Sequence, residues 1–267
     1  MGKGSSAAPV GVAGRRIVVT GASRGIGRGL AEGFSRRGAT VALVARPSDD
    51  LDEVAAATGG TAYPCDLAEP DAVAGLVERV EADGPVDVLV NNAGISLVGW
   101  AFDQDHDDID RLLQVNLHAP IHLTRDWVPR MLDRGRGHVV NVSSLAAVMS
   151  PPGLSYYSAA KAGISAYTAA LRQDLRDLPV HVTTVHIGSV PTGMDAESRE
   201  YGPLAAAAAA SSGRDLTPVE DVVDAIADAL ETGRTDVRLP KMMALMPAMV
   251  DVPRAMTRAI FKRYPPR

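Results

Sequence analysis

The sequence predicts an α/β fold in which a doubly wound parallel sheet of about seven strands carries helices on both faces. Short apolar runs typical of buried strands alternate along the chain with longer segments of helical periodicity. The runs are apolar at successive positions, which indicates strands that are buried on both sides. Because no linker-like segment interrupts this alternation, we expect a single domain.

The first half of the chain contains four predicted strands, and turn residues end the helices between them. Gly38 ends the first helix, and Pro70 occupies the first turn of the third, where a missing N–H is tolerated. The expected strands span 16–20, 41–45, 61–63 and 86–91, and the expected helices span 25–37, about 50–57 and 70–82.

The second half of the chain continues the same pattern. A helical region is expected from about Asp105 to Leu132, with Pro129 as a kink or late break. Thr217-Pro-Val-Glu220 fits a capping box with proline at the first helical position, and Gly233 ends that helix. The other expected elements are strands at 138–142, 180–186 and 236–239 and helices at 155–177 and 217–231.

Composition excludes several classes of protein. Hydrophobic residues make up 46% of the 267 residues and charged residues 22%, as in ordinary soluble domains. No apolar run approaches the ~18 residues of a membrane span, and no secretory signal follows Lys3, so a cytoplasmic protein is expected. The histidines show no metal-ligand spacing, so no metal is expected, and Cys65 is interpreted as a buried small residue.

The two ends of the chain differ in composition from the domain, which is expected to span 14–240. Residues 1–13 are interpreted as a flexible leader, although the first six also fit a myristoylation pattern. Residues 241–267 are rich in methionine and basic residues, which favours core or subunit-interface packing, with a membrane-surface or lipid-facing cover over the pocket as the alternative. The acidic balance of the remainder argues against nucleic-acid binding.

A glycine-rich segment, Thr20-Gly-Ala-Ser-Arg-Gly-Ile-Gly27, joins the first predicted strand to the first helix. Gly21 permits a tight turn, and Gly25 and Gly27 let phosphate oxygens approach backbone N–H groups at a helix N-terminus. This position predicts dinucleotide binding, although the spacing differs from the commonest glycine fingerprint of such loops.

Tyr157 and Lys161 lie four residues apart in a predicted helix, so the phenol and the ammonium are expected side by side on one face. A free phenol titrates near pH ~10, and a neighbouring cation favours the phenolate, which brings the tyrosine pKa toward a range useful for acid–base catalysis. Together with the glycine-rich loop, the pair indicates a nicotinamide-dependent oxidoreductase of carbonyls and alcohols.

These motifs resemble those of the short-chain dehydrogenase/reductase family, classical type, whose cofactor loop has the form T-G-x-x-x-G-x-G, and the resemblance extends to about Thr192. It implies a Rossmann-type fold. Asn116 matches the catalytic asparagine of the family, and Ser144, thirteen residues before Tyr157, matches its catalytic serine. Ser143 is the competing candidate, and strand alternation and spacing favour Ser144. The implied catalytic residues are Asn116, Ser144, Tyr157 and Lys161.

The resemblance also implies a set of cofactor contacts. Asn91-Asn-Ala-Gly94 is similar to the family element that borders the adenosine, and Asp66 with Leu67 matches the residues that meet the adenine. Ile187 replaces a proline common in the family, which leaves open the shape of the turn into an expected substrate lid over 189–216. The expected contacts are Gly21, Ser23, Arg24, Gly25, Ile26, Gly27, Arg46, Asp66, Leu67, Asn91, Ala93, Gly94, Tyr157, Lys161, Gly188, Val190 and Thr192.

The end of the second predicted strand indicates which cofactor is bound. An acidic residue there would bind the ribose hydroxyls of NAD and repel a 2′-phosphate. The chain has Ala45 at this position, followed by Arg46, and Arg24 lies in the glycine-rich loop. Two guanidinium groups suit a phosphate dianion, so NADP(H) is predicted in preference to NAD(H).

By analogy with the family, hydride passes between the nicotinamide and a carbonyl carbon while Tyr157 acts as the general acid or base. Lys161 is expected to lower the tyrosine pKa and hold the ribose, Ser144 to bind the carbonyl oxygen, and Asn116 to hold a water. The expected pocket wall is apolar and indicates a small hydrophobic ketone or secondary alcohol; it consists of Ile95, Val98, Met149, Pro151, Leu154 and Met194.

Two other functions stay open from the sequence. One is reduction of 3-oxoacyl thioesters, and the other is a non-catalytic NADP(H)-binding sensor or scaffold on the same fold. The family resemblance further implies a homodimer or homotetramer.

Overall fold

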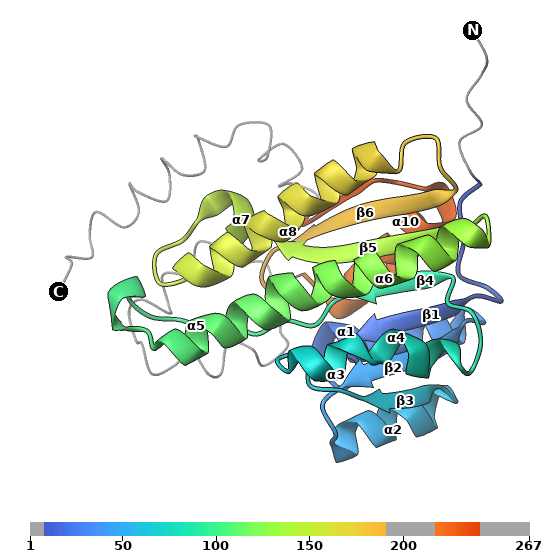
Figure 1. Cartoon of the computed structure of the whole chain (residues 1–267), viewed down its shortest axis with the longest axis horizontal. Helices are drawn as coiled ribbons and strands as arrows, with labels where there is room; N and C mark the ends of the chain where they lie inside the picture. Colours follow the sequence, from blue (N-terminus) through green and yellow to red (C-terminus); the bar gives the residue numbers. More distant parts are fainter. Residues whose placement is uncertain (1–7, 191–216, 241–267) are drawn as a thin grey trace, which may run out of the picture.

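The computed structural model describes residues 8–190 and 217–240. Within these ranges seven parallel strands form one sheet in the order β3-β2-β1-β4-β5-β6-β7 (Figure 1). The strands are β1 (Arg16–Thr20), β2 (Thr40–Ala45), β3 (Thr61–Pro64), β4 (Val88–Asn91), β5 (Gly137–Ser144), β6 (Val180–Ile187) and β7 (Asp236–Leu239). The predicted fold class is confirmed, and each expected strand is present with slightly shifted ends.

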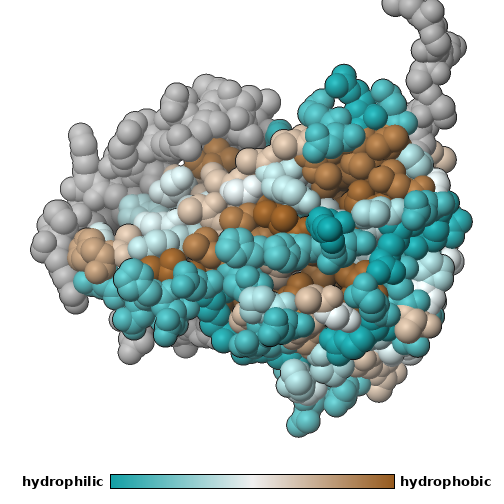
Figure 2. Space-filling view, in the orientation of Figure 1, coloured by the Kyte–Doolittle hydropathy of each residue, from teal (hydrophilic) through white to brown (hydrophobic). Residues whose placement is uncertain are grey.

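Helices lie on both faces of this sheet (Figure 1). They are α1 (Gly25–Arg36), α2 (Asp49–Thr58), α3 (Pro70–Ala74), α4 (Leu76–Glu81), α5 (His106–Leu113), α6 (Ala119–Asp133), α7 (Ala146–Met149), α8 (Ser155–Asp174) and α10 (Val219–Thr232). A 3-10 turn, η1 (Ala101–Asp103), precedes α5, and a π-helical turn, η2 (Gln114–His118), joins α5 to α6. In the same orientation, hydrophilic residues dominate the surface of α5 (Figure 2).

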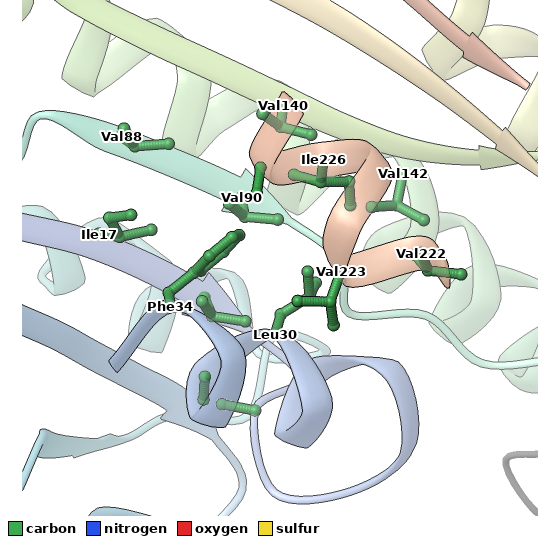
Figure 3. Packing of buried hydrophobic residues seen from close by; sticks show 14 of the residues in the cluster. Ile17, Leu30, Phe34, Val88, Val90, Val140, Val142, Val222, Val223 and Ile226 are labelled. Atoms are coloured by element: carbon green, nitrogen blue, oxygen red, sulfur yellow. The ribbon is translucent and has the colours of Figure 1, made fainter. Parts of the chain in front are cut away.

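One face of the sheet is covered by α1, α2 and α10, and its core is shown in Figure 3. Leu30 and Phe34 of α1, Val223 of α10 and Ile17 of β1 belong to this cluster, and all four side chains are buried; Figure 3 shows Val223 beside Leu30. The two helices approach closely because α1 presents glycine: a Cβ on Gly33 would lie 2.4 Å from Val223. This packing fixes the first helix behind the glycine-rich loop.

The opposite face is covered by α3, α4, α6 and α8, and it forms a second buried cluster. Leu123 and Trp127 of α6 and Leu76 of α4 are fully buried there. Successive residues of a strand pack into opposite clusters, since Ile17 belongs to the first cluster and Val18 to the second. The successive apolar positions in the strands therefore have the expected cause, which is burial on both sides.

Several helix boundaries differ from the prediction. The helix expected over 70–82 is split at Gly75 into α3 and α4, and the region expected from Asp105 to Leu132 is α5, the η2 turn and α6. Pro129 lies inside α6, which continues to Asp133 because fully buried Trp127 and Met131 hold both sides of the proline in the core. The helix expected over 155–177 ends at Asp174.

The predicted capping box at Thr217 is not formed. Helix α10 starts at Val219 after Pro218, and no side chain caps it. Glu220 and Asp221 in its first turn place negative charge near the N–H groups at the helix N-terminus, which is favourable for the helix dipole. Gly233 ends the helix in the left-handed conformation, as expected.

The predicted flexible leader over 1–13 is wrong for its second part. Val10 and Val12 are buried in the first core cluster. Gly11 N donates to Leu230 O at 3.0 Å, and Val12 N donates to Glu231 Oε1 at 3.0 Å. Residues 8–13 are therefore a packed segment, because two apolar side chains find a partner in α10. Residues 1–7, 191–216 and 241–267, including most of the expected lid and the whole basic extension, lie outside the described residues.

From β1 the sheet grows in one direction through β2 and β3, and in the other direction from β4 to β7. The strand order therefore reverses between β1 and β4, which are neighbours in the sheet. In an open parallel sheet the crevice outside the carboxyl ends of such strands is the usual ligand site. The loops that follow β1, β2, β3, β4, β5 and β6 all open on this edge because every strand pair is parallel.

Candidate active site

A cavity of about 670 Å³ lies along the carboxyl edge of the sheet. Its wall collects most of the residues that the sequence analysis proposed, although they come from loops far apart in the chain. Those that line it are Gly21, Ser23, Arg24, Gly25, Ile26, Gly27, Arg46, Asp66, Leu67, Ala93, Gly94, Ser144, Tyr157, Lys161, Gly188 and Val190. Asn91 and Asn116 are not among the lining residues, and Thr192 lies outside the described residues.

The glycine-rich loop leaves the start of α1 ready for an anion. Arg24 precedes the helix, no side chain caps it, and its first turn contains no acidic residue. The contrast is α2, where Ser48 caps the helix and three aspartates occupy the first turn. Because no side chain caps the first N–H groups of α1 and these groups form the positive end of the helix dipole, they fit a cofactor phosphate.

The loop is held against β4 by contacts that need glycine and threonine. Gly21 has a φ of +67°, and a Cβ on it would lie 2.9 Å from the Cα of Ala93. Thr20 Oγ1 accepts hydrogen bonds from the backbone N–H groups of Asn92 and Ala93, each at 3.0 Å. The ends of β1 and β4 are thereby clamped together at the switch point of the sheet.

Lys161 is buried beside Tyr157 in the first part of α8. Its Nζ donates to the backbone oxygen of Val142 at 3.0 Å and lies 5.7 Å from the centre of the Tyr157 ring. Burial lowers the pKa of Lys161 from 10.5 to about 8, because desolvation disfavours the ammonium. The spacing of four residues in a helix thus brings cation and phenol together, as predicted.

Asn116 lies in the η2 turn and is almost fully buried. Its Oδ1 accepts from Ile95 N at 3.0 Å, and its Nδ2 donates to Ile95 O at 2.7 Å. A Cβ on Gly94 would lie 2.8 Å from Asn116 Oδ1 and 3.4 Å from Lys161 Nζ. The glycine after β4 therefore allows the asparagine and the lysine, from two different helical segments, to approach each other.

The two serines at the end of β5 have different partners. Ser143 is buried, and its hydroxyl donates to Lys161 O at 2.9 Å and contacts Ser165 Oγ at 2.8 Å. Ser144 Oγ accepts from Ala146 N at 3.1 Å, which leaves its hydroxyl hydrogen for another acceptor. These contacts favour a structural role for Ser143 and a substrate-facing role for Ser144.

The far end of the cavity carries charged side chains. Arg24 and Arg46 are exposed, and neither makes an ion pair with another described residue. Asp66 Oδ1 accepts from Ala68 N at 3.0 Å, and its Oδ2 pairs with Arg111 at 3.2 Å. The pair ties the loop after β3 to α5.

Asn91, expected among the cofactor contacts, is buried in a polar network instead. Its Nδ2 donates to Asn141 Oδ1 at 2.8 Å and to Thr124 Oγ1 at 3.1 Å. The side chain thus links β4 to β5 and α6, and its neighbour Asn92 lines the cavity.

Ser48, Asp50 and Arg111 also line the cavity, although they were not among the residues predicted from the sequence. Ser48 and Asp50 follow Arg46 at the start of α2. They could have been predicted, because this helix begins directly after β2, the strand whose end was expected to bind the cofactor. Arg111 had no local signal, because its partner Asp66 is 45 residues away. Asp50 places a carboxylate in the wall of the same cavity as Arg24 and Arg46.

A phosphate-binding loop at the switch point of a parallel sheet, and a Ser–Tyr–Lys set on the same cavity, define an oxidoreductase that uses a nicotinamide dinucleotide. Residues 15–202 match the short chain dehydrogenase family, and the chain belongs to it.

Among curated relatives, a fatty acyl-CoA reductase of Mycobacterium tuberculosis is 39% identical over 214 residues, which cover 76% of this chain and 72% of the relative. The ketoacyl reductase HetN of Nostoc is 34% identical over 231 residues, 84% of this chain and 78% of that protein. Among solved structures, a short-chain dehydrogenase from Sphingobium yanoikuyae in complex with NADPH has a TM-score of 0.78 at 27% identity, covering 95% of this chain and 98% of the other.

Within residues 8–190 and 217–240, no helix is long and apolar enough to cross a membrane. The same ranges contain no cluster of histidine, cysteine and acidic side chains arranged to bind a metal ion.

Proposed function

We propose that the chain is an NADP(H)-dependent oxidoreductase that interconverts a hydrophobic ketone and a secondary alcohol. The observation that carries this proposal is the grouping of Ser144, Tyr157 and Lys161 on one cavity whose other end carries an uncapped helix N-terminus and two arginines. The cavity can therefore receive a long dinucleotide with its reactive end beside a proton donor.

The bound cofactor supplies or accepts the hydride. Tyr157 Oη holds the proton that a carbonyl oxygen receives during reduction, and the Lys161 ammonium 5.7 Å from the ring centre favours the phenolate left behind. The Ser144 hydroxyl donates to the same substrate oxygen, where negative charge develops in the transition state. The hydrogen bond from Lys161 Nζ to Val142 O fixes the ammonium in place.

Preference for NADP(H) is supported by Arg24 and Arg46, which are exposed at the cavity and suit the 2′-phosphate. The structural relative from Sphingobium yanoikuyae is in complex with NADPH. Asp50 opposes this preference, because a carboxylate in the same wall repels a phosphate dianion. We infer that the two guanidinium groups outweigh this single carboxylate.

The apolar character of the substrate is supported by Ile95, Ala146, Leu154 and Val190, which line the cavity. Of the other expected wall residues, Val98, Met149 and Pro151 are buried but are not among the lining residues, and Met194 lies outside the described residues.

A second candidate is the reduction of 3-oxoacyl thioesters. It is favoured by two relatives whose names are fatty acyl-CoA reductase and ketoacyl reductase. A non-catalytic sensor on the same fold would bind the cofactor without turning over any carbonyl.

A turnover assay separates these functions. Purified protein with NADPH is tested against apolar ketones and 3-oxoacyl thioesters, and with NADP⁺ against secondary alcohols, by following NADPH absorbance. Tyr157→Phe is the control; it should lower kcat by ~10²–10⁴-fold while cofactor affinity stays near that of the unmodified protein. Retention of more than about a tenth of kcat by the variant would refute Tyr157 as the general acid.

A further inference from the structure

The loop between β4 and α5 carries two stacked aromatic side chains, of which Trp100 is half-buried and Phe102 is exposed. The rings of Trp100 and Phe102 lie 6.1 Å apart between centres with an interplanar angle of 11°. Phe102 is 76% exposed, and in the described part of the chain the one other large hydrophobic residue with comparable exposure is Leu178, at 44%. We call Trp100 and Phe102 the aromatic shelf.

The aromatic shelf is attached to the helix that carries Tyr157. Gly99 N donates to Gly153 O at 3.0 Å, just before α8. Tyr156 Oη, next to the catalytic tyrosine, donates to Ala101 O at 2.8 Å, between the two aromatic residues.

The cavity reaches the same region from inside. Ile95 and Ser96, at the start of the shelf loop, line the cavity, as does Leu154 at the start of α8. Trp100 and Phe102 are not themselves among the lining residues, but they follow Ile95 and Ser96 in the same loop, and hydrogen bonds tie this loop to Gly153 and Tyr156, which flank the lining residues Leu154 and Tyr157.

The charge around the aromatic shelf restricts what it can bind. Residues 101–110 contain five exposed aspartates and neither lysine nor arginine; they are Asp103, Asp105, Asp107, Asp108 and Asp110. Figure 2 shows the resulting hydrophilic surface over α5 beside a hydrophobic area near the start of that helix. Anionic groups, such as lipid phosphates or the phosphates of an acyl carrier, are disfavoured next to this segment.

We infer that the aromatic shelf binds the neutral apolar chain of the substrate beyond its carbonyl, so that Trp100 and Phe102 determine chain-length preference. This inference rests on the proposed function for the reacting end of the substrate. An alkyl chain that leaves the cavity past Leu154 covers exposed aromatic surface, and each covered ring removes apolar area from water. The surrounding aspartates select against a chain that ends in a carboxylate or phosphate.

The first test measures binding without turnover. The sequence has two tryptophans, and Trp127 is fully buried in α6, so a ligand-dependent change in tryptophan emission reports on Trp100. Enzyme saturated with NADP⁺ is titrated with methyl decyl ketone, a pair that cannot react because both partners are oxidised. We expect a saturable shift of the emission to shorter wavelength. Trp100→Phe keeps an aromatic ring and should lose the signal.

The second test compares rates for short and long substrates. With methyl decyl ketone and NADPH, Phe102→Ala should lower kcat/KM about tenfold, equivalent to about 1.4 kcal/mol, and leave kcat/KM for methyl ethyl ketone within about twofold. Because Phe102 is 76% exposed, its truncation leaves no internal cavity. Leu178→Ala is the matched control, since Leu178 is exposed just before β6, at the opposite edge of the sheet, and should change neither rate.

The outcomes separate the two proposals. The ratio of kcat/KM for methyl decyl ketone to kcat/KM for methyl ethyl ketone is the decisive quantity. If this ratio is the same in the unmodified protein and Phe102→Ala, and both turn over ketones normally, the shelf is overturned and the proposed function stands. If the Kd of methyl decyl ketone, measured by the emission shift, rises about tenfold in Phe102→Ala and no ketone is turned over, the shelf is supported and the proposed function is overturned. An absent emission shift, or one that persists in Trp100→Phe, would overturn the shelf.

Discussion

Replacing Lys161 with methionine should abolish activity and stabilise the cofactor-free protein. Burial lowers the pKa of this lysine from 10.5 to about 8, so the folded state disfavours the charge that the group carries at neutral pH. At about 1.36 kcal/mol per pKa unit, this shift corresponds to a cost of about 3 kcal/mol at pH ~7.

Methionine has a similar length and no charge, so Lys161→Met removes this cost. It also removes the hydrogen bond from Lys161 Nζ to the Val142 carbonyl oxygen, which is 3.0 Å long in the structure. Leaving that buried acceptor without its donor costs about 1 kcal/mol. The expected net gain in the free energy of unfolding is therefore about 2 kcal/mol at pH ~7.

The dependence on pH identifies the source of the gain. Because the folded pKa is lowered, the unfolded chain binds more protons than the folded one between about pH 8 and 10.5. The unmodified protein should therefore gain stability relative to Lys161→Met as the pH rises through this window. At pH ~10 the remaining cost of burying the lysine is about 1 kcal/mol, so the advantage of the variant should vanish.

Urea unfolding of the cofactor-free proteins at the two pH values measures both differences. Tyr157→Phe is the control at pH ~7, where the phenol is neutral in the unfolded chain; it is expected to be inactive without removing the buried lysine, and its stability at that pH should follow that of the unmodified protein. A Lys161→Met protein that is less stable at pH ~7 would refute the reasoning. A gain that stayed the same at pH ~10 would show that packing, and not charge, is its source.

Three further predictions concern the cofactor end and the opposite edge of the sheet. Ala45→Asp with Arg46→Ala should raise the Kd of NADPH relative to that of NADH by about tenfold or more in fluorescence titrations, because a repulsive carboxylate replaces a phosphate contact; an unchanged ratio would place the 2′-phosphate elsewhere. Asp50→Asn should tighten NADPH binding by about fivefold in the same titration without affecting NADH, since it removes one like charge from the cavity wall. Burial and neighbouring His181 lower the pKa of His138 from 6.5 to about 3, so the unfolded chain takes up a proton first as the pH falls below about 6.5. Between pH ~7 and pH ~5 the protein should lose about 2 kcal/mol more stability than His138→Leu, and parallel losses in urea unfolding would contradict this assignment.

The fold was predictable because its determinants are local. Strands such as Arg16–Thr20 are apolar at successive positions, and glycine or proline separates them from helices. The predictions that were wrong concerned segments whose structure depends on contacts with residues far away in the sequence. Val10 and Val12 are buried because α10 provides their partners more than two hundred residues later. The π-helical turn at Asn116 likewise depends on the backbone of Ile95, which no periodicity in α5 or α6 reveals.

In the candidate site too, contacts between residues close in sequence were predictable and contacts between distant segments were not. Tyr157 and Lys161 lie close in sequence and share a helix, so their spacing was sufficient to predict their proximity. The choice between Ser143 and Ser144 rested on strand alternation and spacing, and the structure adds a contact, since Ser143 is engaged with Lys161 O and Ser165. The ion pair of Asp66 with Arg111 joins separate segments and left no pattern in the sequence.

The reacting end of the site and the proposed substrate end differ in how firmly the structure holds them. Asn116 and Lys161 are buried, Asn116 is hydrogen-bonded to the backbone of Ile95 in the loop after β4 and Lys161 to Val142 O in β5, and Gly94 leaves no room for a larger side chain between them. In the aromatic shelf Phe102 is exposed and Trp100 half-buried, and hydrogen bonds join its loop to Gly153, just before α8, and to Tyr156 in α8. A substitution at the reacting end disturbs buried polar groups that the proposed catalysis requires, whereas truncation of Phe102 on the shelf changes an exposed side chain. Chain-length preference can therefore change at Trp100 and Phe102 while the proton-transfer geometry stays the same.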